Sequence, residues 1–455
     1  MEENISNEKK HWTENVLVKV ILIGFLILAL MIPSVMINEL VRERSSRKME
    51  VTHEVSSKWG LLQTITGPYI VIPYLEEVKY TNQTSEWREQ KFFYFPQVLE
   101  IDGDMTPVIR KRSIFEVMLY ESKINMRGHF SFPDLHALKI TPDKVMWEKA
   151  RLHLSLTDLS GIGASVNLEI GDTLIPMTAA VPAGLQLPTG LMCNLPDGVT
   201  QNEKMDFQIA LSLKGSQGLY FSPVAGKNKV KLVSTWPSPK FEGQFLPDTS
   251  TITTDGFEAE WTILDINRQI TQEWTDSNPQ TFQNVNPIRY DQSTAYENSS
   301  TAKPVFGVEL LDTVDHYTKN QRTVKYAFLL ITLTFAVYFF CEVLKKQKVH
   351  PLQYGLVGVA LVIFFILLLS LSEHLGFDPA YGIAATATIL LIALYSRSIF
   401  SEKKYALVTG SLLFALFGFI YIILQLEDYA LLAGSIALFM IIALIMYLTR
   451  KVRWG

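Results

Sequence analysis

The sequence is poor in cysteine and close to neutral in charge. Only two of its 455 residues are cysteines, Cys193 and Cys341, which excludes a disulfide-stapled fold. We interpret both as small packing residues. Lysine and arginine total 41 against 45 acidic residues, a net charge of −4, so no basic surface indicates a nucleic-acid partner.

Motifs of common catalytic sites are also missing. The chain has no H-E-x-x-H zinc motif, no G-x-x-x-x-G-K-[ST] phosphate loop and no G-x-S-x-G nucleophile elbow. The stretch "GIGASV" lacks the third glycine of a dinucleotide fingerprint, and we interpret it as a β-turn. Four histidines lack metal-ligand spacing and are expected at the surface or at strand edges: His53, His129, His136 and His153. These absences argue against an enzyme of the common classes, and the sequence predicts no cofactor.

Apolar residues concentrate near the N-terminus and in the last third, and the mean hydropathy is +0.17. About 20 apolar residues in a helix span the hydrocarbon core of a membrane. Residues 16–37 form one such run, which is too long for a signal-peptide core and has no cleavage pattern after it, so it predicts an uncleaved signal anchor. Further spans are predicted at residues 324–344, 354–371, 380–395, 405–424 and 429–448. The prediction is thus six transmembrane helices, with five in a C-terminal bundle over residues 324–448.

Lysine and arginine in the short loops predict the orientation, because cytoplasmic loops carry an excess of both. The loops "LKKQKVHP" and "SRSIFSEKK" and the tail "TRKVRWG" are basic, whereas "SEHLGFDP" and "QLED" contain no lysine or arginine. Residues 1–15 and 449–455 are therefore expected in the cytoplasm, and residues 38–323 on the other side. A local signal opposes this assignment, since four basic residues follow the first span: Arg42, Arg44, Arg47 and Lys48.

The region from 38 to 323 alternates apolar and polar residues. In "FQIALSLKG", Phe207, Ile209, Leu211 and Leu213 share one face, as in a half-buried antiparallel strand. "HLSLTDL", "VNLEIGD" and "GFEAEWTI" alternate likewise, with turn residues between them. The pattern predicts an all-β, sandwich-like domain, or two small sandwiches. A charged helix is predicted at residues 40–60, before the strands. Residues 265–303 are rich in Gln, Asn, Ser and Thr and are interpreted as a less ordered connection, or an insertion, before the last strand, "PVFGVELLD".

Polar side chains of the last third lie near the ends of the predicted spans, where a charge costs less than at mid-membrane. The candidate functional residues are Glu373, His374, His350, Gln425, Glu427 and Asp428. The motif "SEH" either marks the outer end of a span or forms a working site. In the second case a third polar group, such as Gln425 or Asp428, must converge on Glu373 and His374. No acid lies in mid-span, which argues against a proton relay.

Several long stretches match a known family in order. They include residues 314–377, "GFIYIILQLEDYALLAGSIALF" and "YLTRKVRW", and in the β region "TGPYIVIPY", "LKGSQGLYFSP" and "STWPSPKFEGQFLP". In these stretches the chain resembles the CreD family of bacterial inner-membrane proteins. The resemblance implies a Gram-negative inner-membrane protein with a periplasmic β-rich domain over residues 38–323. It also implies a link to cell-envelope integrity, colicin tolerance and stress responses, with expression under a two-component system. It supplies no catalytic residues.

Three functions remain open on this basis. The first is a non-enzymatic envelope protein, anchored in the lipid bilayer, whose periplasmic domain binds a protein, peptidoglycan or lipid partner. The second is a transporter or lipid-handling protein with a path through the C-terminal bundle, because five clustered spans exceed what an anchor requires. The third is a membrane-embedded enzyme that uses Glu373 and His374.

Overall fold

The structure is a computed structural model whose described residues form two compact units. They are 16–79, 85–136, 138–185, 187, 189–196, 198, 204–268, 270–276, 304–310, 316–345, 349–400, 403–426 and a few positions between 432 and 446. The membrane unit comprises Met1–Lys48 and Val314–Gly455, and the β unit comprises Met49–Thr313.

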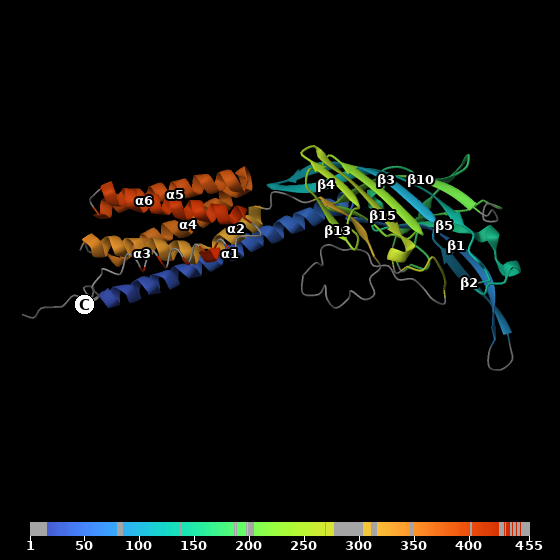
Figure 1. Ribbon diagram of the computed structural model, residues 1–455, viewed down its shortest axis with the longest axis horizontal. Helices are drawn as coiled ribbons and strands as arrows, with labels where there is room; N and C mark the ends of the chain where they lie inside the picture. Colours follow the sequence, from blue (N-terminus) through green and yellow to red (C-terminus); the bar gives the residue numbers. More distant parts are fainter. Residues whose placement is uncertain are drawn as a thin grey trace, which may run out of the picture. The chain divides into compact units, whose positions relative to one another are not determined.

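Helix α1 (Val16–Trp59) belongs to both units (Figure 1). Its 44 residues run without a break, although Pro33 lies inside it, and correspond to a length of about 66 Å. The first half is apolar and the second half is charged, so the helix predicted at residues 40–60 continues the first span directly. The buried side chains of its apolar half follow one narrow stripe: Ile23, Leu30, Ser34, Ile37 and Val41.

The other helices of the membrane unit are α2 (His316–Lys325), α3 (Ala327–Lys345), α4 (Pro351–Leu375), α5 (Phe377–Phe400) and α6 (Lys403–Gln425). Among the described residues, α1, α4, α5 and α6 are long and apolar enough to cross a membrane. The pair α2 and α3, bent by 44°, passes the same test as one span. The span predicted at residues 429–448 lies largely outside the described residues.

Local sequence explains where α4 begins and ends. Pro351 stands at its first position, where no backbone N–H is needed, and Gly376 ends it with φ +78°.

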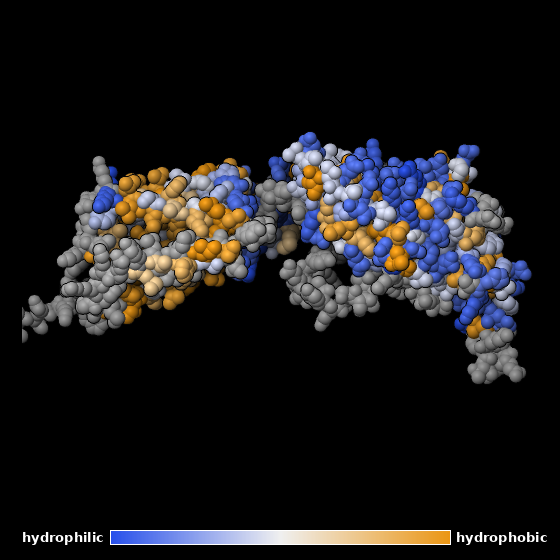
Figure 2. Space-filling model, in the orientation of Figure 1, coloured by the Kyte–Doolittle hydropathy of each residue, from blue (hydrophilic) through white to orange (hydrophobic). Residues whose placement is uncertain are grey.

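Inside the unit, aromatic rings pack between helices. The ring centroids of Phe364 in α4 and Phe417 in α6, for example, lie 4.7 Å apart. Leu390, Leu407 and other large apolar side chains face outward, and Figure 2 shows hydrophobic residues spread over these helices.

The β unit contains two sheets. The nine-stranded sheet has the order β13 (Pro239–Gly243), β17 (Phe306–Leu310), β11 (Gly218–Phe221), β1 (Gln63–Lys79), β5 (Arg151–Leu156), β9 (Gly190–Asn194) and β8 (Thr178–Ala180), with β2 (Ser85–Tyr94) on β1 and β16 (Glu273–Thr275) on β2. The eight-stranded sheet has the order β14 (Thr249–Thr253), β15 (Gly256–Leu264), β12 (Lys227–Ser234), β3 (Val98–Arg112), β4 (Phe115–Ser131), β10 (Lys204–Ser216), β6 (Asn167–Ile170) and β7 (Thr173–Pro176). Pairs β1–β11 and β3–β12 are parallel, and the other paired strands are antiparallel.

The two sheets share one hydrophobic core. On β10, Phe207, Ile209, Leu211 and Leu213 are buried and the residues between them are more exposed, so the predicted period of two is confirmed. Side chains from both sheets, such as Ile65 and Ile209, belong to the same buried cluster. The predicted β-rich region is therefore present, and strand β17 lies where the last strand was expected.

Two expectations for the β unit were wrong. Part of the stretch predicted to be less ordered forms β16, where Trp274 stacks on Phe93 at 5.0 Å, while residues 277–303 lie outside the described part. His153, expected at the surface or at a strand edge, lies in β5 between β1 and β9, is 4% exposed, and stacks on Tyr69 with 5.4 Å between the ring centroids. In both cases residues distant in sequence supply the packing that local pattern does not show.

Candidate functional site

A buried ion pair joins α1 to α3 in the membrane unit. Lys19, near the start of the apolar half of α1, contacts Glu342, near the end of α3. The two side chains are only 15% and 9% exposed. Removing both charges from water is costly, so such a pair persists only where further hydrogen bonds complete it.

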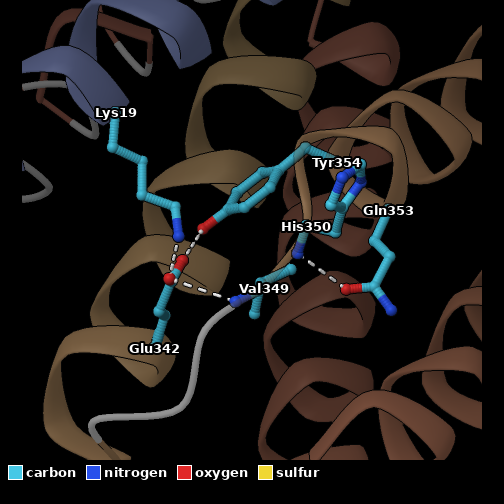
Figure 3. Close-up of polar contacts among 6 residues, drawn as sticks. All are labelled: Lys19, Glu342, Val349, His350, Gln353 and Tyr354. Atoms are coloured by element: carbon cyan, nitrogen blue, oxygen red, sulfur yellow. Dashed lines mark hydrogen bonds and ion pairs between the residues drawn. The ribbon is translucent and has the colours of Figure 1, made fainter. Parts of the chain in front are cut away.

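Two more donors complete this cluster, which we call the Glu342 cluster (Lys19, Glu342, Val349 and Tyr354). The Tyr354 hydroxyl of α4 donates to Glu342 Oε2 at 2.9 Å, and the backbone N–H of Val349 donates to Oε1 at 3.1 Å. Figure 3 shows the three donors converging on the carboxylate from α1, from α4 and from the segment before α4. Both carboxylate oxygens are thus satisfied, and three helices are joined at one point.

The candidate residue His350 lies beside this cluster in sequence but serves the start of α4. Its Nδ1 accepts a hydrogen bond from the Leu352 N–H at 3.2 Å, and its own N–H donates to Gln353 Oε1 at 2.9 Å (Figure 3). This reciprocal pattern is a capping box, which satisfies backbone donors at a helix start.

A second cluster lies at the opposite end of α4, which we call the Glu373 cluster (Arg44, Tyr317, Asn320, Ser372 and Glu373). The Tyr317 hydroxyl of α2 donates to Glu373 Oε1 at 3.1 Å, and Arg44 Nε of α1 lies 3.8 Å from the same oxygen. Asn320 of α2 donates to Ser372 Oγ at 2.8 Å. The Glu373 side chain is 11% exposed, so it is held by long-range partners and does not reach freely into water.

The remaining candidate residues do not join Glu373. His374 is exposed, and no hydrogen bond or ion pair links it to another described residue. The Gln425 amide of α6 donates to Asp378 Oδ1 at 2.9 Å, and the Tyr421 hydroxyl donates to the same oxygen at 3.1 Å. Asp378 stands in the first turn of α5, where the helix dipole favours an anion.

Chemistry at "SEH" would require a third polar group, such as Gln425, beside Glu373 and His374. The Gln425 amide donates to Asp378 instead, so Gln425 does not join that pair. Glu427 and Asp428 lie outside the described residues. Among the residues that the structure does describe, no group of three His, Cys, Asp or Glu side chains could hold a metal ion.

The two clusters have the same arrangement, because in each an acid of the bundle contacts a base of α1. Tyr354 and Glu373 lie 19 positions apart on α4, which corresponds to about 28 Å. No sequence motif indicated that Lys19, Arg44, Tyr317 and Tyr354 belong to a site. One signal could have indicated the two bases. An acid stands near the end of each of two apolar runs, Glu342 and Glu373, and a basic residue stands near each end of the first apolar run, Lys19 and Arg44.

These features define a multi-pass membrane protein that carries a large β-rich unit. The family model described as Inner membrane protein CreD matches residues 15–455. Inner membrane protein CreD of Escherichia coli (strain K12) is 30% identical over 433 residues, which cover 94% of this chain and 91% of that protein. The chain belongs to the CreD family of inner-membrane proteins.

Likeness to solved structures is slight. The M1 zinc metallopeptidase from Deinococcus radiodurans matches with 8% identity and a TM-score of 0.19, covering 37% of this chain and 38% of that one. A second crystal structure of this metallopeptidase matches with 7% identity and a TM-score of 0.18 over the same shares. Scores this low carry no argument about fold or activity.

Proposed function

We propose that this protein maintains cell-envelope integrity under envelope stress, as a non-enzymatic protein of the inner membrane. The β unit lies in the periplasm and binds a protein, peptidoglycan or lipid partner. The membrane unit crosses the bilayer six times, with both termini in the cytoplasm. The basic loops around residues 345–348 and 397–404 support this orientation.

The observation that carries the proposal is that two acids of the membrane unit are already bound by neighbouring side chains. Glu342 and Glu373 are each engaged by a base of α1 and by a tyrosine hydroxyl. Groups held in this way join helices to one another, whereas a general acid or a carrier site must be open to a substrate or proton. The arrangement favours a protein that holds and positions its β unit.

A transporter or lipid-handling protein is the second candidate, and polar groups inside the bundle favour it. The Tyr338 hydroxyl of α3 contacts Ser396 of α5, and both residues are fully buried. Thr388 and Thr409 are also buried. These side chains carry no charge. The Tyr338 and Ser396 hydroxyls hydrogen-bond to each other, and Ser396 also donates to the Ile392 carbonyl of its own helix, as is common where membrane helices pack.

Complementation of a deletion strain that has an envelope-stress phenotype tests the proposal. Glu373→Gln keeps an oxygen that can accept from Tyr317 but removes the charge. We expect Glu373→Gln and His374→Ala to rescue at normal membrane levels, and Glu373→Ala to rescue less because Tyr317 and Arg44 lose their contacts with the Glu373 carboxylate. Failure of Glu373→Gln and of His374→Ala, with both proteins present and inserted, would instead support chemistry or coupled transport at "SEH".

The orientation is tested separately by labelling with a membrane-impermeant maleimide. Both native cysteines are buried, so they give a low background. Cysteine at the exposed position Ser57 should react in intact spheroplasts, and cysteine at the exposed position Lys404 should react only after lysis. The reverse pattern would invert the topology.

A further inference from the structure

Strand β14 forms an open edge of the eight-stranded sheet, because β15 is its only partner among the described strands. We propose that β14 is the docking site for an extended polypeptide segment, with alternating apolar and basic residues, that adds one strand to this sheet. This inference rests on the proposed function and deepens it, since it names the class of partner that the β unit binds and the place of binding.

The backbone of β14 is accessible along its free side. All five of its residues, from Thr249 to Thr253, are exposed, and they pair with β15 in unbroken register. In an antiparallel pair, every second residue directs its N–H and C=O away from the partner strand. Within the described part of the chain, β14 therefore presents a row of backbone donors and acceptors that an added strand can bind.

The other strands at the ends of the two sheets have features that oppose such pairing. β13 contains Pro239 and the charged residues Lys240 and Glu242, and β7 ends at Pro176. β8 and β16 are three residues long. Prolines, charges and short length are the usual protection of a sheet edge. β14 is longer than β7, β8 and β16 and contains neither proline nor charge, so it is the edge best suited to pairing.

The core-facing side of β14 favours apolar side chains on an added strand. Residues directly opposite each other in an antiparallel pair lie on the same face of the sheet. Ile252 pairs with the buried Phe257, so it lies on the core-facing side, yet it is 52% exposed. Leu246, just before β14, is 73% exposed and follows Phe245, whose carbonyl accepts from the buried Trp261 indole at 3.3 Å. An apolar side chain on this face covers Ile252.

The outer side of β14 favours basic side chains. Thr249 and Thr251 pair with Glu260 and Glu258, which are 36% and 50% exposed. The two glutamates share Lys231 of β12, and neither β14 nor β15 contains a lysine or arginine. Because threonine is short, a long basic side chain of an added strand reaches across it to the glutamates. Charge complementarity therefore selects a basic segment over an acidic one.

Hydrogen bonds hold both ends of β14. At its start, the Asp248 N–H donates to the Glu260 carbonyl at 2.8 Å, and the Thr262 N–H donates to Asp248 Oδ2 at 2.7 Å. At its end, the Thr253 hydroxyl donates to the Gly256 carbonyl at 3.2 Å. The edge is thus formed before a partner arrives, which lowers the cost of ordering it on binding.

Peptide binding to the full-length protein, in nanodiscs of zwitterionic lipid, tests the proposal. The probe is a fluorescein-labelled peptide of about ten residues that alternates valine and lysine, and binding is read by fluorescence anisotropy. Two control peptides have the same composition in a non-alternating order or glutamate in place of lysine. The protein variant is Ile252→Lys, and its matched control is Leu174→Lys, because Leu174 is 64% exposed on the edge strand β7 of the same sheet.

We expect saturable binding of the valine–lysine peptide and weaker binding of both control peptides. Ile252→Lys should weaken binding at least about tenfold, because the new charge repels the peptide and removes the apolar contact, whereas Leu174→Lys should not change it. Hydrogen–deuterium exchange reports the added strand itself. With peptide bound, the β14 amides should exchange at least about tenfold more slowly, and the β7 amides should not change.

The proposal would be overturned if no saturable binding occurs up to about 1 mM peptide, or if Ile252→Lys or either control peptide binds as well as the original pair. Protection of β14 that needs no peptide and rises with protein concentration would also overturn it, because a second copy would then occupy the edge. If Ile252→Lys does not fold, the three peptides on the unchanged protein decide. None of these results depends on envelope complementation, so this inference and the proposed function can fail separately.

Discussion

Replacing Lys19 by methionine tests whether the Glu342 cluster stabilises the membrane unit. The substitution keeps an apolar side chain of similar length and leaves the buried carboxylate without its cation. Removing one partner of a buried ion pair costs about 3–5 kcal/mol. Here the Tyr354 hydroxyl and the Val349 N–H still reach the carboxylate, so we expect a loss of about 2–3 kcal/mol.

Removing the charge of the other partner, Glu342, should lower the free energy of unfolding by less. Glu342→Gln keeps one oxygen that can accept from Tyr354 or Val349, and Lys19 lies near the helix start, where its long side chain can reach the interface. We expect a loss of about 1–2 kcal/mol. In the double variant no unpaired charge remains, so its loss should resemble that of Glu342→Gln alone, well below the sum of the two.

The assay is the thermal midpoint of the full-length protein in detergent, followed by fluorescence-detected size exclusion. At about 2–4 °C per kcal/mol for a unit of this size, Lys19→Met should lower the midpoint by roughly 4–12 °C. Lys111→Met is the matched control, because Lys111 and its partner Glu116 are 75% and 57% exposed. Additive losses, or a Lys19→Met loss no larger than the control, would refute the reasoning, because the pair would then behave as a surface pair.

Two further predictions concern packing and pH. Gly358→Leu should destabilise the membrane unit by about 1–3 kcal/mol, because the new side chain displaces Leu30. Gly355→Leu is the control and should have little effect, because nothing lies within 4 Å of a Cβ added there. The thermal midpoints of the two variants test this prediction. Burial lowers the pKa of His153 from 6.5 to about 4, so the unfolded chain binds the proton first and stability is lost as pH falls from 6.5 towards 4. The loss should reach about 3 kcal/mol near pH 4 in urea unfolding followed by tryptophan fluorescence, and His153→Phe, which keeps the stacking on Tyr69, should lose less over that range.

The sequence alone determined the elements that depend on local pattern. Runs of about 20 apolar residues predicted α1, α4, α5 and α6, and alternation with a period of two predicted strands such as β10. The start of α4 is also local, because His350, Pro351 and Gln353 satisfy its first turn among themselves. Membrane class and β-rich class follow from these patterns, since each depends only on residues a few positions apart.

Only the tertiary structure decided which polar groups meet. The acids at the ends of α3 and α4 were visible in the sequence, but the bases that pair with them lie about 300 positions away on α1. From the sequence, Gln425 could bond either Glu373 or Asp378 at the same end of the bundle. The packing of α5 and α6 places its amide within hydrogen-bond distance of Asp378. An ion pair requires two side chains within a few ångströms, and that distance depends on how whole helices pack, which local periodicity does not specify.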